Sequence, residues 1–167
     1  SWLWIAMVAM MFGNFMALLD IQIVASAIGA IQAGVGASNS EVTRVQSAYL
    51  IAEVIGIPLS GFLGRALGIR LLFTLSALLF GLASLACAMA WDLNSLVLFR
   101  AIQGFVGAAM VPTTMATLYT RFPQSKQAMA GAMIGLISSL GPTIGPTFGG
   151  TMAEHFGWRS LFSINII

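Results

Sequence analysis

Apolar residues fall into six long runs along this 167-residue chain, and short polar stretches separate the runs. Each run is close to the roughly 20 residues that a helix needs to cross a hydrocarbon core of about 30 Å. Barrel strands would instead need about ten residues of alternating polarity, which these runs lack. We therefore expect an all-α membrane protein whose six helices cover about 2–28, 46–63, 71–90, 95–119, 128–152 and 158–167.

Composition agrees with a bilayer environment. The chain is 59% hydrophobic and 7% charged, whereas soluble domains carry about 25% charged residues. Its scattered basic residues form no stripe for nucleic acid. The chain also opens and closes directly on apolar sequence, so we expect residues 1–167 to be the N-terminal bundle of a longer polypeptide, with the sixth helix cut short.

Loop charge predicts the orientation. The loop after the second run contains Arg65 and Arg70, and the loop after the fourth contains Arg121 and Lys126, without an acid in either. Basic loops stay in the cytoplasm. The N-terminus is then cytoplasmic as well, in a multi-pass membrane protein. Tryptophans at two outer segment edges, at positions 91 and 158, fit an interfacial aromatic belt.

Three charges interrupt apolar runs: Asp20, Glu53 and Arg100. A charge within a bilayer costs at least a few kcal/mol, so such residues usually face a protein interior or a water path and handle ions or protons. With this orientation, all three lie within about 10 Å of one another in depth. The structural alternatives are that Arg100 reaches the interface with its long side chain, and that Tyr49 only satisfies Glu53 by hydrogen bonding.

Enzyme chemistry has no support in the sequence. The chain has no paired His and Cys at metal-ligand spacing and no phosphate-binding glycine loop, and its one histidine, His155, falls in a predicted outer loop. The single Cys87 cannot form an internal disulfide and fits a packing role. We expect no enzyme activity, no metal and no bound cofactor.

The fifth run has an unusual glycine and proline pattern. Gly141, Gly145 and Gly149 recur every four residues and so share one helix face. Glycine faces allow close helix approach in lipid. Pro142 and Pro146 each remove a backbone donor, which a packed membrane helix tolerates. This pattern favours a bent, tightly packed helix at a moving interface over a plain packing surface.

Motifs of one known family occur along the chain in that family's order. ALLDIQIV surrounds Asp20, and YLIAEVIGIPLSGFL contains Glu53. LFRAIQGFVGAA supplies Arg100, Gln103, Gly104 and Gly107. The fifth run supplies Gly141, Pro142, Gly145, Pro146, Gly149 and Gly150. In these motifs the chain resembles the major facilitator superfamily and, within it, the fourteen-helix drug:proton antiporters of the EmrB/QacA type, nearest to the EmrB-like members.

The resemblance implies a fold of two inverted three-helix repeats. It also implies a proton-coupled multidrug antiporter, which expels amphipathic or cationic compounds by alternating access and uses the proton gradient as its energy source. Asp20 is then the main proton-binding acid, Arg100 its electrostatic partner and Glu53 a second acid. Gln103 and Tyr49 support the network. The expected partners are amphipathic substrates, the bilayer and, as for EmrB-like pumps, a periplasmic adaptor and an outer-membrane channel.

One loop departs from the family pattern. Gly61, Gly68 and Arg70 match the superfamily's motif between helices two and three, but Arg65 stands where an acid is usual. The role of this loop as a conformational latch is therefore in doubt. Two alternatives stay open for the function: a facilitator that exports another solute, such as a lipid or metabolite, and a non-transporting membrane receptor or scaffold.

Overall fold

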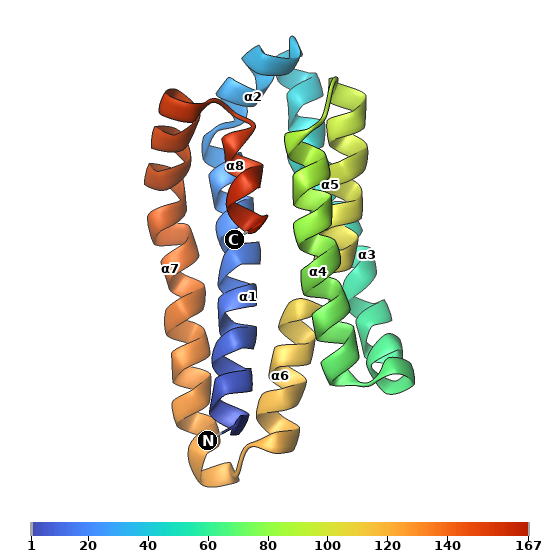
Figure 1. Ribbon diagram of the computed structural model, residues 1–167, viewed down its shortest axis with the longest axis vertical. Helices are drawn as coiled ribbons and strands as arrows, with labels where there is room; N and C mark the ends of the chain where they lie inside the picture. Colours follow the sequence, from blue (N-terminus) through green and yellow to red (C-terminus); the bar gives the residue numbers. More distant parts are fainter. Residues whose placement is uncertain (1, 167) are drawn as a thin grey trace.

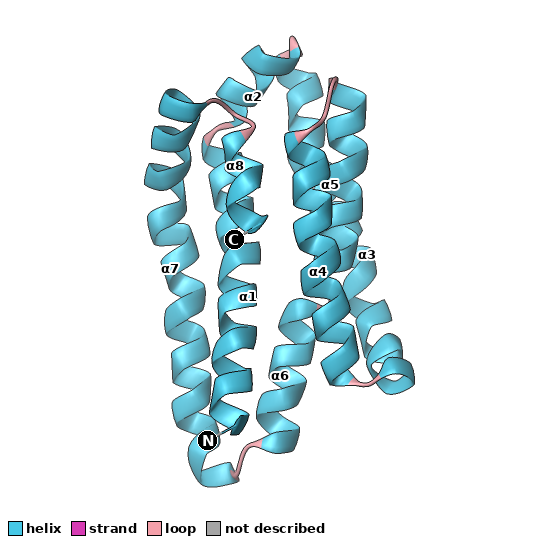
Figure 2. Ribbon diagram, viewed as in Figure 1, coloured by secondary structure: helices cyan, strands magenta, loops and turns pink. Residues whose placement is uncertain are grey.

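The computed structural model describes residues 2–166, and helices make up nearly all of them, with no strand in that range (Figures 1 and 2). The helices are α1 (Trp2–Ser26), α2 (Ile28–Val35), α3 (Asn39–Leu67), α4 (Ile69–Ala88), α5 (Leu93–Gly107), α6 (Met110–Arg121), α7 (Gln124–Phe156) and α8 (Ser160–Ser163), followed by a 3-10 helix, η1 (Ile164–Ile166). Within residues 2–166, five segments are long and apolar enough to cross a membrane: α1, α3, α4, α5 with α6, and α7. The fold is therefore an all-helical membrane bundle, and α8 and η1 begin its sixth segment. The predicted end of that segment, residue 167, lies outside the described residues.

The second span begins earlier than its apolar run. Helix α3 starts at Asn39, where the sequence suggested a start near residue 46. Ser38 accepts a hydrogen bond from the backbone N–H of Glu41, and the Glu41 carboxylate accepts one from the N–H of Ser38. This capping box satisfies two backbone donors at the helix start. It therefore allows a polar stretch expected between the spans to be helical.

Short turns separate α1 from α2 and α5 from α6. The first turn, at Ala27, falls at the end of the helix predicted over about 2–28, and α2 follows it. The second turn, at Ala108 and Ala109, interrupts the fourth span, where the sequence predicted one continuous helix over about 95–119. Alanine gives no local sign of a helix end, so periodicity alone does not reveal this second turn.

Glycines set the closest helix contacts. In α7, Gly141, Gly145 and Gly149 are buried against α1, which runs alongside it (Figure 1). A methyl group added to Gly145 would lie 2.5 Å from Cβ of Gln22. On the other side of the bundle, Gly104 of α5 lies against the backbone of Tyr49 in α3. Both helix pairs therefore depend on positions without a side chain, as small-residue packing in membranes does.

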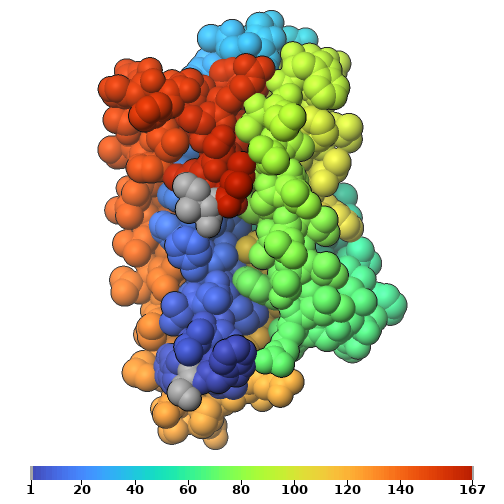
Figure 3. All heavy atoms as spheres, viewed as in Figure 1, coloured from blue at the N-terminus to red at the C-terminus, as the bar shows by residue number. Residues whose placement is uncertain are grey.

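The C-terminal segment lies in the upper half of the bundle. Figure 3 shows it between the α1–α7 column and α4 on the face in view. Leu161 and Phe162 are fully buried, and Trp158 is 8% exposed and packs edge-on against Phe162. Trp158 is thus a core residue and not the interfacial one expected, whereas Trp91 is 76% exposed. This packing brings the start of the sixth segment close to the middle of α1.

Candidate functional site

The buried charges of α1 and α5 meet directly. Arg100 Nη1 donates a hydrogen bond to Asp20 Oδ2 at 2.5 Å, and neither side chain has exposed surface. Each charge compensates for the desolvation of the other, so removing one leaves a buried charge unpaired. Arg100 therefore does not extend to the interface, which was the structural alternative raised by the sequence.

Arg100 is held on several sides. Its Nη1 also donates to Gln103 Oε1 at 2.8 Å, and its Nη2 donates to Gln46 Oε1 at 3.3 Å. The guanidinium carbon lies 4.2 Å from the ring centroid of Tyr49 and 5.8 Å from that of Phe162. Contacts between a cation and an aromatic face strengthen when they are desolvated. The arginine is therefore fixed by hydrogen bonds in its plane and by aromatic rings over its faces.

Two amides hold the second oxygen of Asp20. Asn165 Nδ2 donates to Asp20 Oδ1 at 2.7 Å, and Gln103 Nε2 does so at 3.4 Å. Asn165 Nδ2 also donates to Ser84 Oγ at 3.0 Å, and the Ser84 hydroxyl donates to the carbonyl oxygen of Phe162 at 2.7 Å. We call the following set the Asp20 network: Asp20, Gln46, Ser84, Arg100, Gln103 and Asn165. It joins α1, α3, α4, α5 and η1.

Sequence reasoning missed three members of this network: Gln46, Ser84 and Asn165. Gln46 stands at the predicted start of the second helix, where a polar stretch ends, and Ser84 is one of several serines in apolar runs. Asn165 gave the clearest signal, because an amide in the last apolar run needs hydrogen-bond partners in a membrane. Its partner was not predictable without the packing of the sixth segment.

Glu53 and Tyr49 do not form the hydrogen bond that was the structural alternative for Glu53. Glu53 is half-buried on α3, one turn after Tyr49, and makes no hydrogen bond or ion pair with another described residue. The Tyr49 hydroxyl is buried and, among residues 2–166, has no hydrogen-bond partner. Tyr49 therefore contributes an aromatic face to Arg100 and no hydrogen bond to Glu53.

The four positions of the helix-four motif share one buried face, as their spacing predicted: Arg100, Gln103, Gly104 and Gly107. A side chain at Gly104 would overlap the backbone of Tyr49, and one at Gly107 would lie 2.9 Å from the ring of Phe80. These glycines let α5 approach α3 and α4 closely enough for Arg100 to reach its partners.

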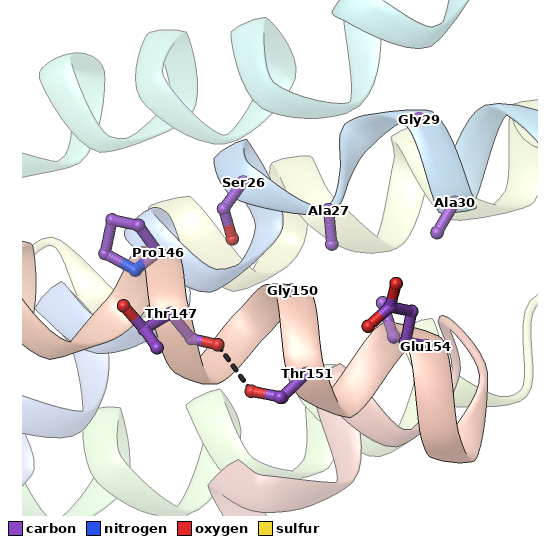
Figure 4. Close-up of a pocket in the computed structure, with 10 residues that line it drawn as sticks. Ser26, Ala27, Gly29, Ala30, Pro146, Thr147, Gly150, Thr151 and Glu154 are labelled. Atoms are coloured by element: carbon purple, nitrogen blue, oxygen red, sulfur yellow. Dashed lines mark hydrogen bonds between the residues drawn. The ribbon is translucent and has the colours of Figure 1, made fainter.

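The fifth-span motif divides between two surfaces. Its buried glycines face α1, whereas Pro142 and Pro146 are exposed and α7 stays helical through both. Pro146 and Gly150 line a groove of about 470 Å³ between α7 and the break that separates α1 from α2 (Figure 4). Glu154 lies at the same groove. This groove is separate from the Asp20 network.

The loop motif between α3 and α4 is compact and exposed. Gly68 alone connects the two helices, with a positive φ of 82° that favours glycine. Arg65 and Arg70 are on the surface, and Gly61 is exposed. None of the described residues forms an ion pair with either arginine.

A second polar contact links α1 to the fourth span, which α5 and α6 form. Asn14 Nδ2 donates to Thr114 Oγ1 at 2.8 Å, and both residues are buried. Thr114 in turn donates to the carbonyl oxygen of Met110 at 2.9 Å. We call Asn14 and Thr114 the Asn14 pair. Within residues 2–166, no three His, Cys, Asp or Glu side chains group as metal ligands would.

The apolar spans, the glycine-packed helix pairs and a charge network buried between helices define a multi-pass membrane protein with an ionisable pair in its interior. The chain belongs to the Major Facilitator Superfamily, whose family model matches residues 10–167.

Similar curated proteins cover almost the whole chain. It is 52% identical over 164 residues to "Colistin resistance protein EmrB" of Acinetobacter baumannii, a match that covers 98% of this chain and 32% of that protein. It is 34% identical over 159 residues to "Multidrug export protein EmrB" of Escherichia coli K12, covering 95% of this chain and 31% of that protein. It is 32% identical over 152 residues to "Fatty acid resistance protein FarB" of Neisseria gonorrhoeae, covering 91% and 30%. The chain thus spans about 32% of the length of the curated relatives it matches.

Proposed function

We propose that this chain is the N-terminal bundle of a proton-coupled multidrug antiporter that exports amphipathic or cationic compounds by alternating access. The observation that carries the proposal is the buried ion pair of Asp20 and Arg100 within the Asp20 network. Intramembrane ionisable pairs that face a bundle interior are typical of proton and ion pathways. The relatives named for drug export and colistin resistance support the substrate class.

The coupling step follows from charge balance. Proton binding neutralises Asp20 and leaves the Arg100 guanidinium buried without its carboxylate, which is unfavourable. A second conformation that hydrates or re-pairs Arg100 is then preferred, and a ligand shifts an equilibrium only through such a difference between states. Proton uptake and conformational change are linked in this way. Glu53, half-buried on α3, is the candidate for a second acid.

We also propose which end of the bundle faces the cytoplasm and in which membrane the protein lies. The α3–α4 connection with Arg65 and Arg70 lies toward the same end of the bundle as the N-terminus, as does the α6–α7 connection with Arg121 and Lys126 (Figure 1). By the positive-inside rule this end is cytoplasmic. The membrane is then the bacterial inner membrane, and the periplasmic end can engage an adaptor and an outer-membrane channel. We propose no catalytic activity and no bound cofactor.

The test uses the complete transporter in vesicles with an imposed proton gradient. Asp20→Asn removes the titratable group and keeps the shape of the side chain, so proton-driven export of a cationic dye should fall at least about tenfold, the effect of about 1.4 kcal/mol. Asp92→Asn is the matched control, because Asp92 is an exposed acid at a helix start. Undiminished proton-driven export by Asp20→Asn would contradict the proposal.

A second candidate is export of fatty acids by the same mechanism. It is favoured by the relative named for fatty acid resistance. The same vesicles distinguish drug export from fatty acid export. Proton-driven export of a fluorescent fatty acid, without export of the cationic dye, favours the second candidate. Absence of any transport would favour the receptor or scaffold alternative.

A further inference from the structure

The Asn165 carboxamide is placed between the proton-binding acid and the main chain of the sixth segment. One of its N–H groups points to Asp20 Oδ1 at 2.7 Å and the other to Ser84 Oγ at 3.0 Å. Its own carbonyl oxygen is buried and, among the residues that the structure describes, has no partner. A buried amide oxygen without a partner is costly. The present orientation of the Asn165 amide is therefore favoured only while Asp20 is ionised and accepts its N–H group.

All donors that contact Asp20 suit its ionised form. Arg100, Gln103 and Asn165 each present N–H groups to the carboxylate. A protonated Asp20 has a new O–H group and requires an acceptor for it. Proton binding therefore leaves the new O–H group of Asp20 facing donors, without an acceptor for its hydrogen.

Only one of the two neighbouring amides can supply that acceptor at low cost. The Gln103 carbonyl already accepts from Arg100 Nη1 at 2.8 Å and from Cys87 Sγ at 3.7 Å, so reversing it would turn an NH₂ group toward the guanidinium. The Asn165 carbonyl has no such bond to lose within the described part of the chain. Reversing the Asn165 amide brings its oxygen to the protonated Asp20 and gives that oxygen a donor, while the NH₂ group leaves Asp20 and Ser84 and takes the place where the oxygen had no partner among the described residues.

This reversal has a consequence at Ser84. The Ser84 hydroxyl now accepts from Asn165 and donates to the carbonyl of Phe162 at 2.7 Å. Once the Asn165 oxygen faces Ser84, the hydroxyl can donate to it instead, which releases the Phe162 carbonyl at the start of the sixth segment. No covalent bond changes apart from the O–H that the proton forms with Asp20.

We propose that Asn165 is a positioning residue that senses proton binding at Asp20 and transmits it through Ser84 to the backbone of the sixth segment. The inference rests on the proposed role of Asp20 in proton coupling and adds the route by which a packed helix responds. The titratable groups that surround the site are Arg100 on α5, Tyr49 and Glu53 on α3, and Cys87 on α4. Because none of them belongs to the sixth segment, Asn165 is its direct contact with Asp20.

The experiment measures the pH profile of export by the complete transporter in vesicles. Asn165→Leu removes one hydrogen bond to the carboxylate, and such a bond to a charged group is worth roughly one pH unit. We expect the midpoint of the profile to move to higher pH by about that amount. Ser84→Ala should move it in the same direction by less. Ser76→Ala is the matched control, because Ser76 is also buried on α4 but lies outside the Asp20 network.

The outcomes separate this inference from the proposed function. If Asp20→Asn abolishes coupling while Asn165→Leu and Ser84→Ala leave the midpoint unchanged, the inference is wrong and the proposed function stands. If Asp20→Asn keeps full coupling, the proposed function is wrong and the inference with it. In an Asp20→Asn background, Asn165→Leu should cause no further pH shift, and a shift there would also overturn the inference. Should Asn165→Leu not reach the membrane, an unshifted profile for Ser84→Ala has the same meaning.

Discussion

Helix α1 is joined to the fourth span at two levels, and the two contacts differ in kind. At the upper level, Asp20 meets Arg100 in a charged network with partners from five elements. About two turns below, Asn14 meets Thr114 in a single neutral hydrogen bond. Both contacts are buried between the same two spans, so burial does not explain the difference. Only the upper contact contains a group that a proton can neutralise, which makes it the candidate for coupling and the Asn14 pair the candidate for adhesion.

The largest expected effect comes from removing the positive charge. Arg100→Leu leaves Asp20 buried and unpaired, and breaking a buried pair from one side costs about 3–5 kcal/mol. Thermal unfolding of the purified transporter should show this loss, and proton-driven export should stop. Arg65→Leu is the matched control, because Arg65 is exposed and surface substitutions usually change stability by about 0.5 kcal/mol or less. Equal stability of the two variants would contradict the assignment of Arg100 as the charge that compensates buried Asp20.

The next effect tests whether close packing against α7 holds α1 in position for its contacts with Arg100 and Thr114. Gly149→Ala places a methyl group against the Ser26 hydroxyl and 2.8 Å from the carbonyl oxygen of Ile23. Overpacking of this kind costs about 1–3 kcal/mol. Gly150→Ala, one residue on, meets open space and should be neutral or slightly stabilising because alanine favours helix. A stable Gly149→Ala protein would show that α1 and α7 can separate without loss.

The sequence predicted the charged contact better than the neutral one, for a physical reason. A charge in an apolar run is expensive, so Asp20 and Arg100 stand out from the hydropathy pattern alone, and Gln103 follows from its place on the same helix face. Asn14, Ser84 and Thr114 are small neutral residues that apolar helices tolerate, since they can bond to nearby backbone. Their partners come from distant segments, and only packing decides which of them meet.

Helix ends show the same limit. Ser38 followed by Glu41 has the spacing of a capping box, so an earlier start for α3 was readable from the sequence. The break after Gly107, at Ala108 and Ala109, was not, because alanine is the strongest helix former. The burial of Trp158 could not be predicted either, since it depends on the close approach of Gly34 in α2.

A smaller effect is expected at the lower contact. Thr114→Val removes the hydroxyl that accepts from Asn14 and keeps the shape of the side chain. A double-mutant cycle with Asn14→Ala should give a coupling of about 0.6 kcal/mol, typical of polar contacts between membrane helices. The pH profile of export should be unchanged in both single variants. A shifted profile would mean that the Asn14 pair takes part in coupling, which would remove the distinction between the two levels.

The smallest effect contrasts Asp20 with an aspartate outside the membrane. The backbone N–H of Ser95, and then its hydroxyl, lower the pKa of Asp92 from its usual 3.8, and the carboxylate caps α5. A lowered pKa in the folded state means that the ionised group stabilises the fold above the unfolded pKa, and that this stability is lost as the pH falls through the folded pKa. Asp92→Asn keeps a capping oxygen but cannot titrate. Below pH 3.8, the Tm of the wild type should therefore fall relative to that of Asp92→Asn, with no change in transport at neutral pH. An export defect in Asp92→Asn at neutral pH would contradict the view that burial beside a guanidinium, and not the aspartate itself, creates coupling.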